Sequence, residues 1–104
     1  MMHINDYQHE ALGYRLESAD EAYALFGLVG EVGELYGYIA KVIRDGEKDD
    51  HQEYVKKELG DILWFLAAIA YDHGLQLDDI ALANLHKLRS RAERGVIQGS
   101  GDNR

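Results

Sequence analysis

Two pairs of acidic residues interrupt the most apolar stretches of this 104-residue chain. Glu31 and Glu34 stand within LFGLVGEVGELYGYIA, and Glu58 and Asp61 stand within KELGDILWFLAAIA. Each pair has i, i+3 spacing, which places both carboxylates on one face of a helix, about 5–6 Å apart. An isolated buried carboxylate is costly, so four of them require basic partners or cations nearby. Any fold of this chain must therefore bring compensating positive charge to two otherwise apolar helices.

Apolar periodicity and helix-stop residues predict an all-α fold. Gly46 ends one apolar segment, and Gly74 is a candidate C-cap for the next. The predicted helices cover roughly residues 5–16, 20–44, 51–73 and 77–94. We expect residues 1–94 to form a single helical domain, followed by a Gly-rich basic C-terminal tail over residues 95–104.

The second predicted helix carries an unusual number of glycines. Gly27, Gly30, Gly33 and Gly37 all lie inside it, and each costs about 1 kcal/mol of helix stability relative to Ala. Glycine inside a helix indicates close approach of another backbone or of a ligand. Both explanations remain open from the sequence.

Charge and composition exclude several classes of function. The net charge is −8, and seventeen of the nineteen acidic residues lie in residues 1–86, which opposes stable nucleic-acid binding. The basic C-terminal end fits either helix-dipole preference or a phosphate-binding surface beside a metal site. The absence of Cys excludes thiolate chemistry. With no candidate membrane span or signal peptide, we expect a cytoplasmic protein without a membrane partner.

The acidic pairs favour a cation site over protein-based compensation. The nearby bases, Lys41, Lys56 and Lys57, are too few for four converging carboxylates. Oxygen-only ligands are preferred by hard divalent cations, so Mg²⁺ is the expected cofactor, with Mn²⁺ as a substitute. A ferritin-like di-iron site would need Glu-x-x-His pairs, and none is present.

These motifs resemble those of a known family. The segment EVGE from Glu31 to Glu34, followed by KELGD from Lys57 to Asp61, is similar to the ExxE…ExxD signature of the all-α nucleotide pyrophosphohydrolases. The MazG-like branch fits best, in its small single-domain phage and bacterial form. The similarity extends over Tyr7-Gln8, the NLHKLRSR segment and the ending RAERGVIQGSGDNR.

The resemblance implies a four-helix core assembled as a homodimer or a homotetramer (a dimer of dimers), with helices of two subunits forming each site. It also implies Mg²⁺-dependent hydrolysis of a ribo- or deoxyribonucleoside triphosphate to the monophosphate and pyrophosphate, as in cleansing of the nucleotide pool. The implied metal ligands are Glu31, Glu34, Glu58 and Asp61. Many relatives carry another acid just before the first of these, where this chain has Gly30, so no general base can be assigned there.

Further roles follow from residue type and position. Glu34 and Glu58 are the candidate catalytic carboxylates, with Glu34 orienting the attacking water. Cationic and amide side chains, three of them on one stripe of the last helix, suit phosphate oxygens, and flat side chains with polar edges suit a nucleobase. The phosphate-binding candidates are Lys57, Asn84, Lys87, Arg91 and Arg94, and the base-binding candidates are Tyr7, Gln8 and Trp64.

Two other functions fit parts of the pattern. A phosphoribosyl-ATP pyrophosphohydrolase belongs to the same superfamily, but the single-domain layout and the ending fit it less well. A non-catalytic helical oligomer that binds metal or nucleotide for regulation would keep the fold. Retention of all four motif acids favours an enzyme, because a structural protein gains little by burying them.

Overall fold

The structure, a computed structural model, describes residues 1–104 and contains four α-helices and no strands, as the sequence predicts. None of these helices combines the length and the apolar character needed to cross a bilayer. The helices are α1 (Ile4–Leu12), α2 (Glu21–Asp45), α3 (His51–Asp72) and α4 (Leu77–Glu93).

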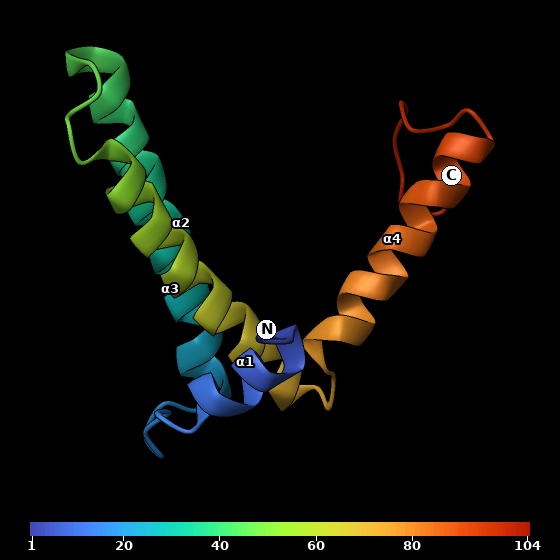
Figure 1. Ribbon diagram of the computed structural model, residues 1–104, viewed down its shortest axis with the longest axis horizontal. Coiled ribbons are helices and arrows are strands. Elements are labelled where there is room, and N and C mark those ends of the chain that lie inside the picture. The colour runs from blue at the N-terminus through green and yellow to red at the C-terminus, as the bar shows by residue number, and fades with distance from the viewer.

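The four helices form two arms that diverge from a common base (Figure 1). Helices α2 and α3 pack side by side as a long antiparallel hairpin, which is the first arm. Helix α1 lies at the base, where it contacts both α3 and α4. Helix α4 is the second arm and points away from the hairpin. The acidic hairpin and the basic end of α4 are therefore apart within one chain.

Local chemistry explains most of the helix ends. The Asp20 side chain caps α2 by accepting a hydrogen bond from the Tyr23 amide at 2.9 Å. Gly46, Gly74 and Gly95 follow the last three helices with positive φ, a conformation that favours glycine. After α3, the amide of Leu75 bonds back to the carbonyl of Ala70 at 2.8 Å, which is a Schellman ending. Helix α1 is the exception, because it stops at Leu12, four residues before its predicted end.

The core of the single chain is small. Two clusters of buried apolar residues lie where α1, α2, α3 and the start of α4 meet, and Phe65 is their largest member. The radius of gyration is 16.7 Å, whereas a compact chain of this length has about 13 Å. Large apolar side chains remain exposed along both arms. They include Leu25, Phe26, Val29, Tyr36 and Ile43 on α2 and Ile80, Leu82, Leu85 and Leu88 on α4.

The helix glycines divide into two kinds. A Cβ atom added at Gly27 would overlap the Phe65 ring, so this glycine lets α3 pack closely. Gly30, Gly33 and Gly37 meet nothing within 4 Å. Helix packing within the chain therefore explains the first glycine and leaves the other three facing open space.

Candidate metal centre

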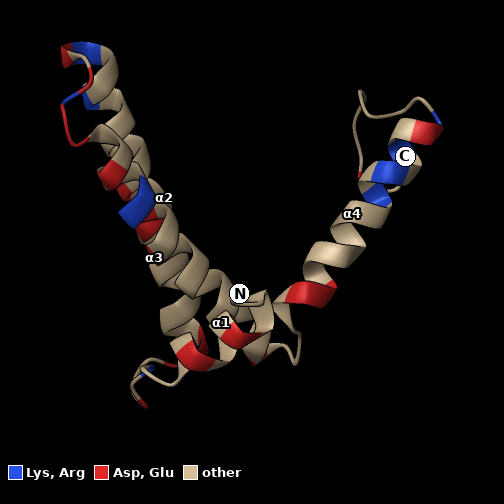
Figure 2. Ribbon diagram, viewed as in Figure 1, with Lys and Arg blue, Asp and Glu red and all other residues tan.

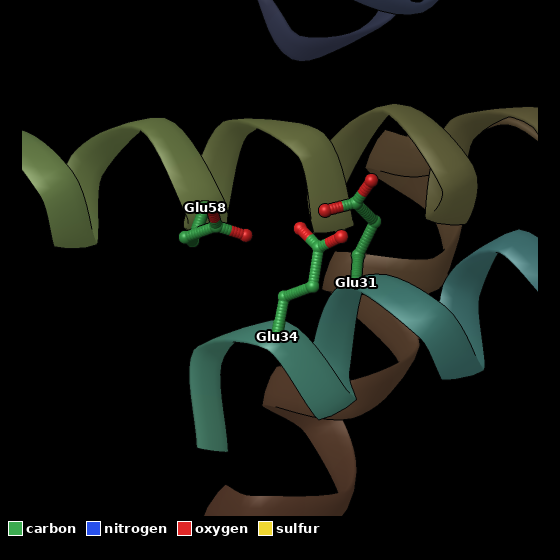
Figure 3. A group of neighbouring side chains, drawn as sticks. All are labelled: Glu31, Glu34 and Glu58. Atoms are coloured by element: carbon green, nitrogen blue, oxygen red, sulfur yellow. The ribbon is translucent and has the colours of Figure 1, made fainter. Parts of the chain in front are cut away.

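Three glutamates converge between the two helices of the hairpin. Glu31 and Glu34 extend from α2 toward α3, and Glu58 extends from α3 toward them (Figure 3). One carboxylate oxygen from each lies within 4.8 Å of the others. The i, i+3 spacing places the α2 pair on one helical face, and the antiparallel packing of α3 supplies the third group.

The electrostatics of this cluster are unfavourable without a cation. The pKa of Glu31 is raised from its ordinary 4.5 to about 7, first by burial and then by the neighbouring carboxylates. One oxygen of Glu31 and one of Glu58, both Oε2, are buried without a hydrogen-bond partner. Buried polar atoms are normally paired. The donor set fits a hard divalent cation, because it offers only oxygens and carries a large negative charge.

Asp61 lies beside the cluster rather than inside it. This residue is exposed, and the group of mutually close ligand oxygens consists of the three glutamates alone. Its charge still reaches the cluster, since it helps to raise the pKa of Glu31. It also helps to raise the pKa of Tyr7, after burial. Asp61 thus acts electrostatically on both the carboxylate cluster and the first helix.

The three base-binding candidates have different surroundings. Tyr7 and Trp64 line one shallow cavity of about 370 Å³ together with Ala11. The Trp64 indole N–H donates to the Ala11 carbonyl at 3.0 Å. Gln8 is buried, and its amide bonds to the backbone of Ala67, Leu75 and Leu77. Its position ties α1 to the start of α4, away from this cavity.

Three of the phosphate-binding candidates, Lys87, Arg91 and Arg94, are hydrogen-bonded to the C-terminal tail. The Asp102 carboxylate accepts from Lys87 Nζ at 2.8 Å and from an Arg91 nitrogen at 3.2 Å. These two cations lower the pKa of Asp102, with Lys87 as the larger cause. Arg94 donates to the carbonyl of Arg104 at 2.8 Å. A carboxylate therefore already lies among the basic side chains that the sequence assigned to phosphate.

The remaining phosphate-binding candidates lie on different helices, and the two arms of the chain differ in charge. Asn84 and Lys87 line a groove of about 470 Å³ on α4, and Lys57 is exposed on α3 next to Glu58. Acidic residues lie along the hairpin arm, and basic residues gather near the far end of α4 (Figure 2). The structure brings three of the four predicted metal ligands together, but within one chain it does not bring the α4 cations to them.

Sequence reasoning overlooked an aromatic group next to the cluster. Tyr38 of α2 and Tyr54 of α3 stack with ring centroids 4.0 Å apart, and the Tyr38 hydroxyl is hydrogen-bonded to His51 Nδ1 at 2.7 Å. The spacing in the sequence could have predicted this group, because Tyr38 follows Glu34 by four residues and Tyr54 precedes Glu58 by four. Residues four apart on a helix share a face.

Comparisons with known proteins identify relatives of the chain. The family model described as the MazG nucleotide pyrophosphohydrolase domain matches residues 20–96. The chain is 42% identical over 86 residues to the Gene 37 protein of Mycobacterium phage L5, an alignment that covers 80% of this chain and 75% of the phage protein. No solved structure matches the chain. The family match confirms the resemblance drawn from the sequence motifs.

Proposed function

This chain belongs to the MazG nucleotide pyrophosphohydrolase family, and on that premise we propose that it is a Mg²⁺-dependent nucleoside triphosphate pyrophosphohydrolase. Its substrates would be free ribo- or deoxyribonucleoside triphosphates in the cytoplasm, and Mn²⁺ would substitute for Mg²⁺. One observation carries the proposal: three carboxylates converge between α2 and α3, and two of their buried oxygens have no protein partner. A divalent cation held by these residues would compensate both oxygens and the excess charge.

The metal ligands would be Glu31, Glu34 and Glu58, with Asp61 joining from the edge of the cluster. The bound cation would neutralise phosphate oxygens and lower the cost of charge that develops during cleavage. Glu34 is exposed, so its carboxylate can face an incoming water, orient it and accept its proton. The water oxygen bonds to the α-phosphorus, the α–β anhydride bond breaks, and pyrophosphate leaves with the bridging oxygen.

The rest of the substrate would be held by side chains around the cluster. Tyr7 and Trp64 share a cavity near Asp61, which suits a flat base with a polar edge. Lys57 lies beside Glu58 in α3. The α4 cations Lys87 and Arg91 would bind phosphate oxygens once the Asp102 carboxylate is displaced from them. Asn84 and Arg94 extend the same surface of α4.

A second copy of the chain would complete this site. The α4 cations and the carboxylates belong to separate arms of one chain, yet both must contact one triphosphate. Each arm exposes large apolar side chains, and three glycines of α2 face open space. Packing α4 of one copy against the hairpin of another would bury these surfaces and bring basic side chains to the acidic cluster. The expected assembly is a homodimer or a homotetramer.

The direct test is a panel assay with each common ribo- and deoxyribonucleoside triphosphate, Mg²⁺, and separate detection of pyrophosphate and orthophosphate. We expect pyrophosphate and monophosphate in equal amounts, and no turnover after chelation of the metal. In heavy-oxygen water the label should enter the monophosphate. Orthophosphate as the only product, or label in the pyrophosphate, would contradict cleavage at the α-phosphorus.

Two variants make the assay specific to the cluster. Glu34→Gln removes a charge from the site and should reduce pyrophosphate release by at least about a hundredfold, as loss of a positioned proton acceptor does. Glu53→Gln is the matched control, because Glu53 is an exposed glutamate of α3 outside the cluster. Equal activity of the two variants would show that the cluster does not support hydrolysis.

A further inference from the structure

An aromatic layer, formed by Tyr38, His51 and Tyr54, lies one helical turn from the carboxylate cluster on the side of the α2–α3 loop. Tyr38 stacks on Tyr54 with an interplanar angle of 25°, and its ring also stacks on His51 with centroids 5.5 Å apart. Four residues of helix rise span about 6 Å. The hairpin register that pairs the tyrosines therefore also pairs Glu34 with Glu58 one turn away.

Contacts on the side of the α2–α3 loop fix the aromatic layer in place. The hydrogen bond of 2.7 Å between the Tyr38 hydroxyl and His51 Nδ1 joins α2 to the first residue of α3. The other imidazole nitrogen, Nε2, lies 3.8 Å from a carboxylate oxygen of Glu47 in the loop. Tyr38 is thereby fixed by both its ring and its hydroxyl. Stacking then restricts the Tyr54 ring, which packs directly on it.

The position of Tyr54 on α3 gives it a specific neighbour. Side chains on a helix lean toward its N-terminus, so Glu58 leans back over the turn that carries Tyr54. Tyr54 and Glu58 are four residues apart on α3, so their side chains are neighbours on one face of that helix. Burial, followed by the charges of Glu58 and Glu34, raises the pKa of Tyr54. A phenol hydroxyl can donate a hydrogen bond to a carboxylate oxygen.

Glu58 is the most buried of the three clustered carboxylates. Its side chain is among the few buried charged groups of the chain, at 8% exposure, and its Oε2 atom has no hydrogen-bond partner. A carboxylate with one oxygen held by a fixed phenol keeps its other oxygen free for a cation. Outer hydrogen bonds of this kind orient metal ligands and set their affinity.

We propose that Tyr54 is a positioning residue whose hydroxyl donates to Glu58 and holds that carboxylate toward Glu31 and Glu34, with Tyr38 and His51 as its fixed backing. The inference rests on the cation site of the proposed function. It adds a residue outside both acidic motifs to the determinants of metal affinity. Loss of the hydroxyl should weaken divalent cation binding about tenfold, while the ring and its stacking remain.

The experiment is a Mn²⁺ titration of the full chain, with free Mn²⁺ followed by electron paramagnetic resonance. Tyr54→Phe deletes only the hydroxyl, and Tyr36→Phe is the matched control on α2, since Tyr36 is 72% exposed. We expect about tenfold weaker binding for Tyr54→Phe and wild-type affinity for Tyr36→Phe. Pyrophosphate release by Tyr54→Phe should recover as Mg²⁺ approaches saturation, which general loss of structure would not produce.

Glu58→Gln, titrated in parallel, separates this inference from the proposed function. If Tyr54→Phe binds Mn²⁺ like the wild type while Glu58→Gln does not, the positioning role is overturned and the metal site stands. If Glu58→Gln also binds like the wild type, both are overturned. The unaltered protein gives a check that needs no Tyr54 variant: Mg²⁺ should change the near-ultraviolet circular dichroism of its tyrosines, and an unchanged spectrum would contradict the inference.

Discussion

Replacing Glu31 by Gln should stabilise the metal-free protein at neutral and alkaline pH. The pKa of Glu31 is about 7 in the folded chain, against 4.5 for an ordinary glutamate. Each pKa unit corresponds to about 1.36 kcal/mol, so ionisation of this carboxyl costs the fold about 3 kcal/mol. Water reaches part of the Glu31 side chain and screens its charge, which reduces this destabilisation to about 1–3 kcal/mol.

The sign of the pH dependence follows from proton linkage. Between pH 4.5 and about 7 the folded chain keeps the Glu31 proton while the unfolded chain has lost it. The contribution of Glu31 to the free energy of unfolding must therefore fall as pH rises through this window, and then level off. In Glu31→Gln this decrease in the free energy of unfolding with rising pH should be absent. The two proteins should have similar stability near pH 4.5, and the variant should be the more stable well above pH 7.

Urea unfolding with a chelator present, at one fixed protein concentration, measures this difference across the pH series. Exposed Glu53 supplies the control substitution, Glu53→Gln, whose stability should follow that of the wild type at every pH. Added Mg²⁺ should then stabilise the wild type more than Glu31→Gln, because a ligand that binds only the folded state raises its stability. A stability difference between wild type and Glu31→Gln that does not change with pH would refute the electrostatic reasoning.

Three further perturbations test other parts of the structure. Gly27→Ala should destabilise the chain by about 1–3 kcal/mol in urea unfolding, because the new methyl group would overlap Phe65, whereas Gly60→Ala, with no neighbour within 4 Å, should not. Asp102→Asn should lower KM for a nucleoside triphosphate several-fold by releasing the α4 cations; an unchanged KM in initial-rate assays would mean that they do not meet phosphate. Leu85→Glu on the exposed face of α4 should abolish self-association in sedimentation velocity, and an unchanged assembly would remove α4 from the interface.

Local chemistry made most of the fold predictable from the sequence. Asp20 caps α2 as its type suggests, and the glycines at 46 and 74 lie just beyond helix ends. The i, i+3 spacing of Glu31 and Glu34 was enough to place both on one face. These features depend on residues close together in the chain, so no tertiary information was needed to find them.

Features that depend on how the helices pack were not predictable in the same way. The two-armed arrangement follows from the contacts of α4 with α1, which no local pattern reports. Asp61 has the spacing of a ligand but lies outside the closest carboxylate group. The stacking of Tyr38 on Tyr54 depends on the register between α2 and α3, and that register is fixed by packing such as Phe65 against Gly27.

Pyrophosphate release measured against Mg²⁺ concentration, for the wild type and Glu58→Gln side by side, tests the metal-dependent hydrolysis most directly. Glu58 is the buried member of the cluster and has an unpaired oxygen. The wild type should release pyrophosphate and monophosphate in a saturable, Mg²⁺-dependent manner, and Glu58→Gln should be inactive at the same Mg²⁺ concentrations while retaining its helices. Release that is independent of Mg²⁺, or undiminished in Glu58→Gln, would contradict a catalytic cation held between α2 and α3.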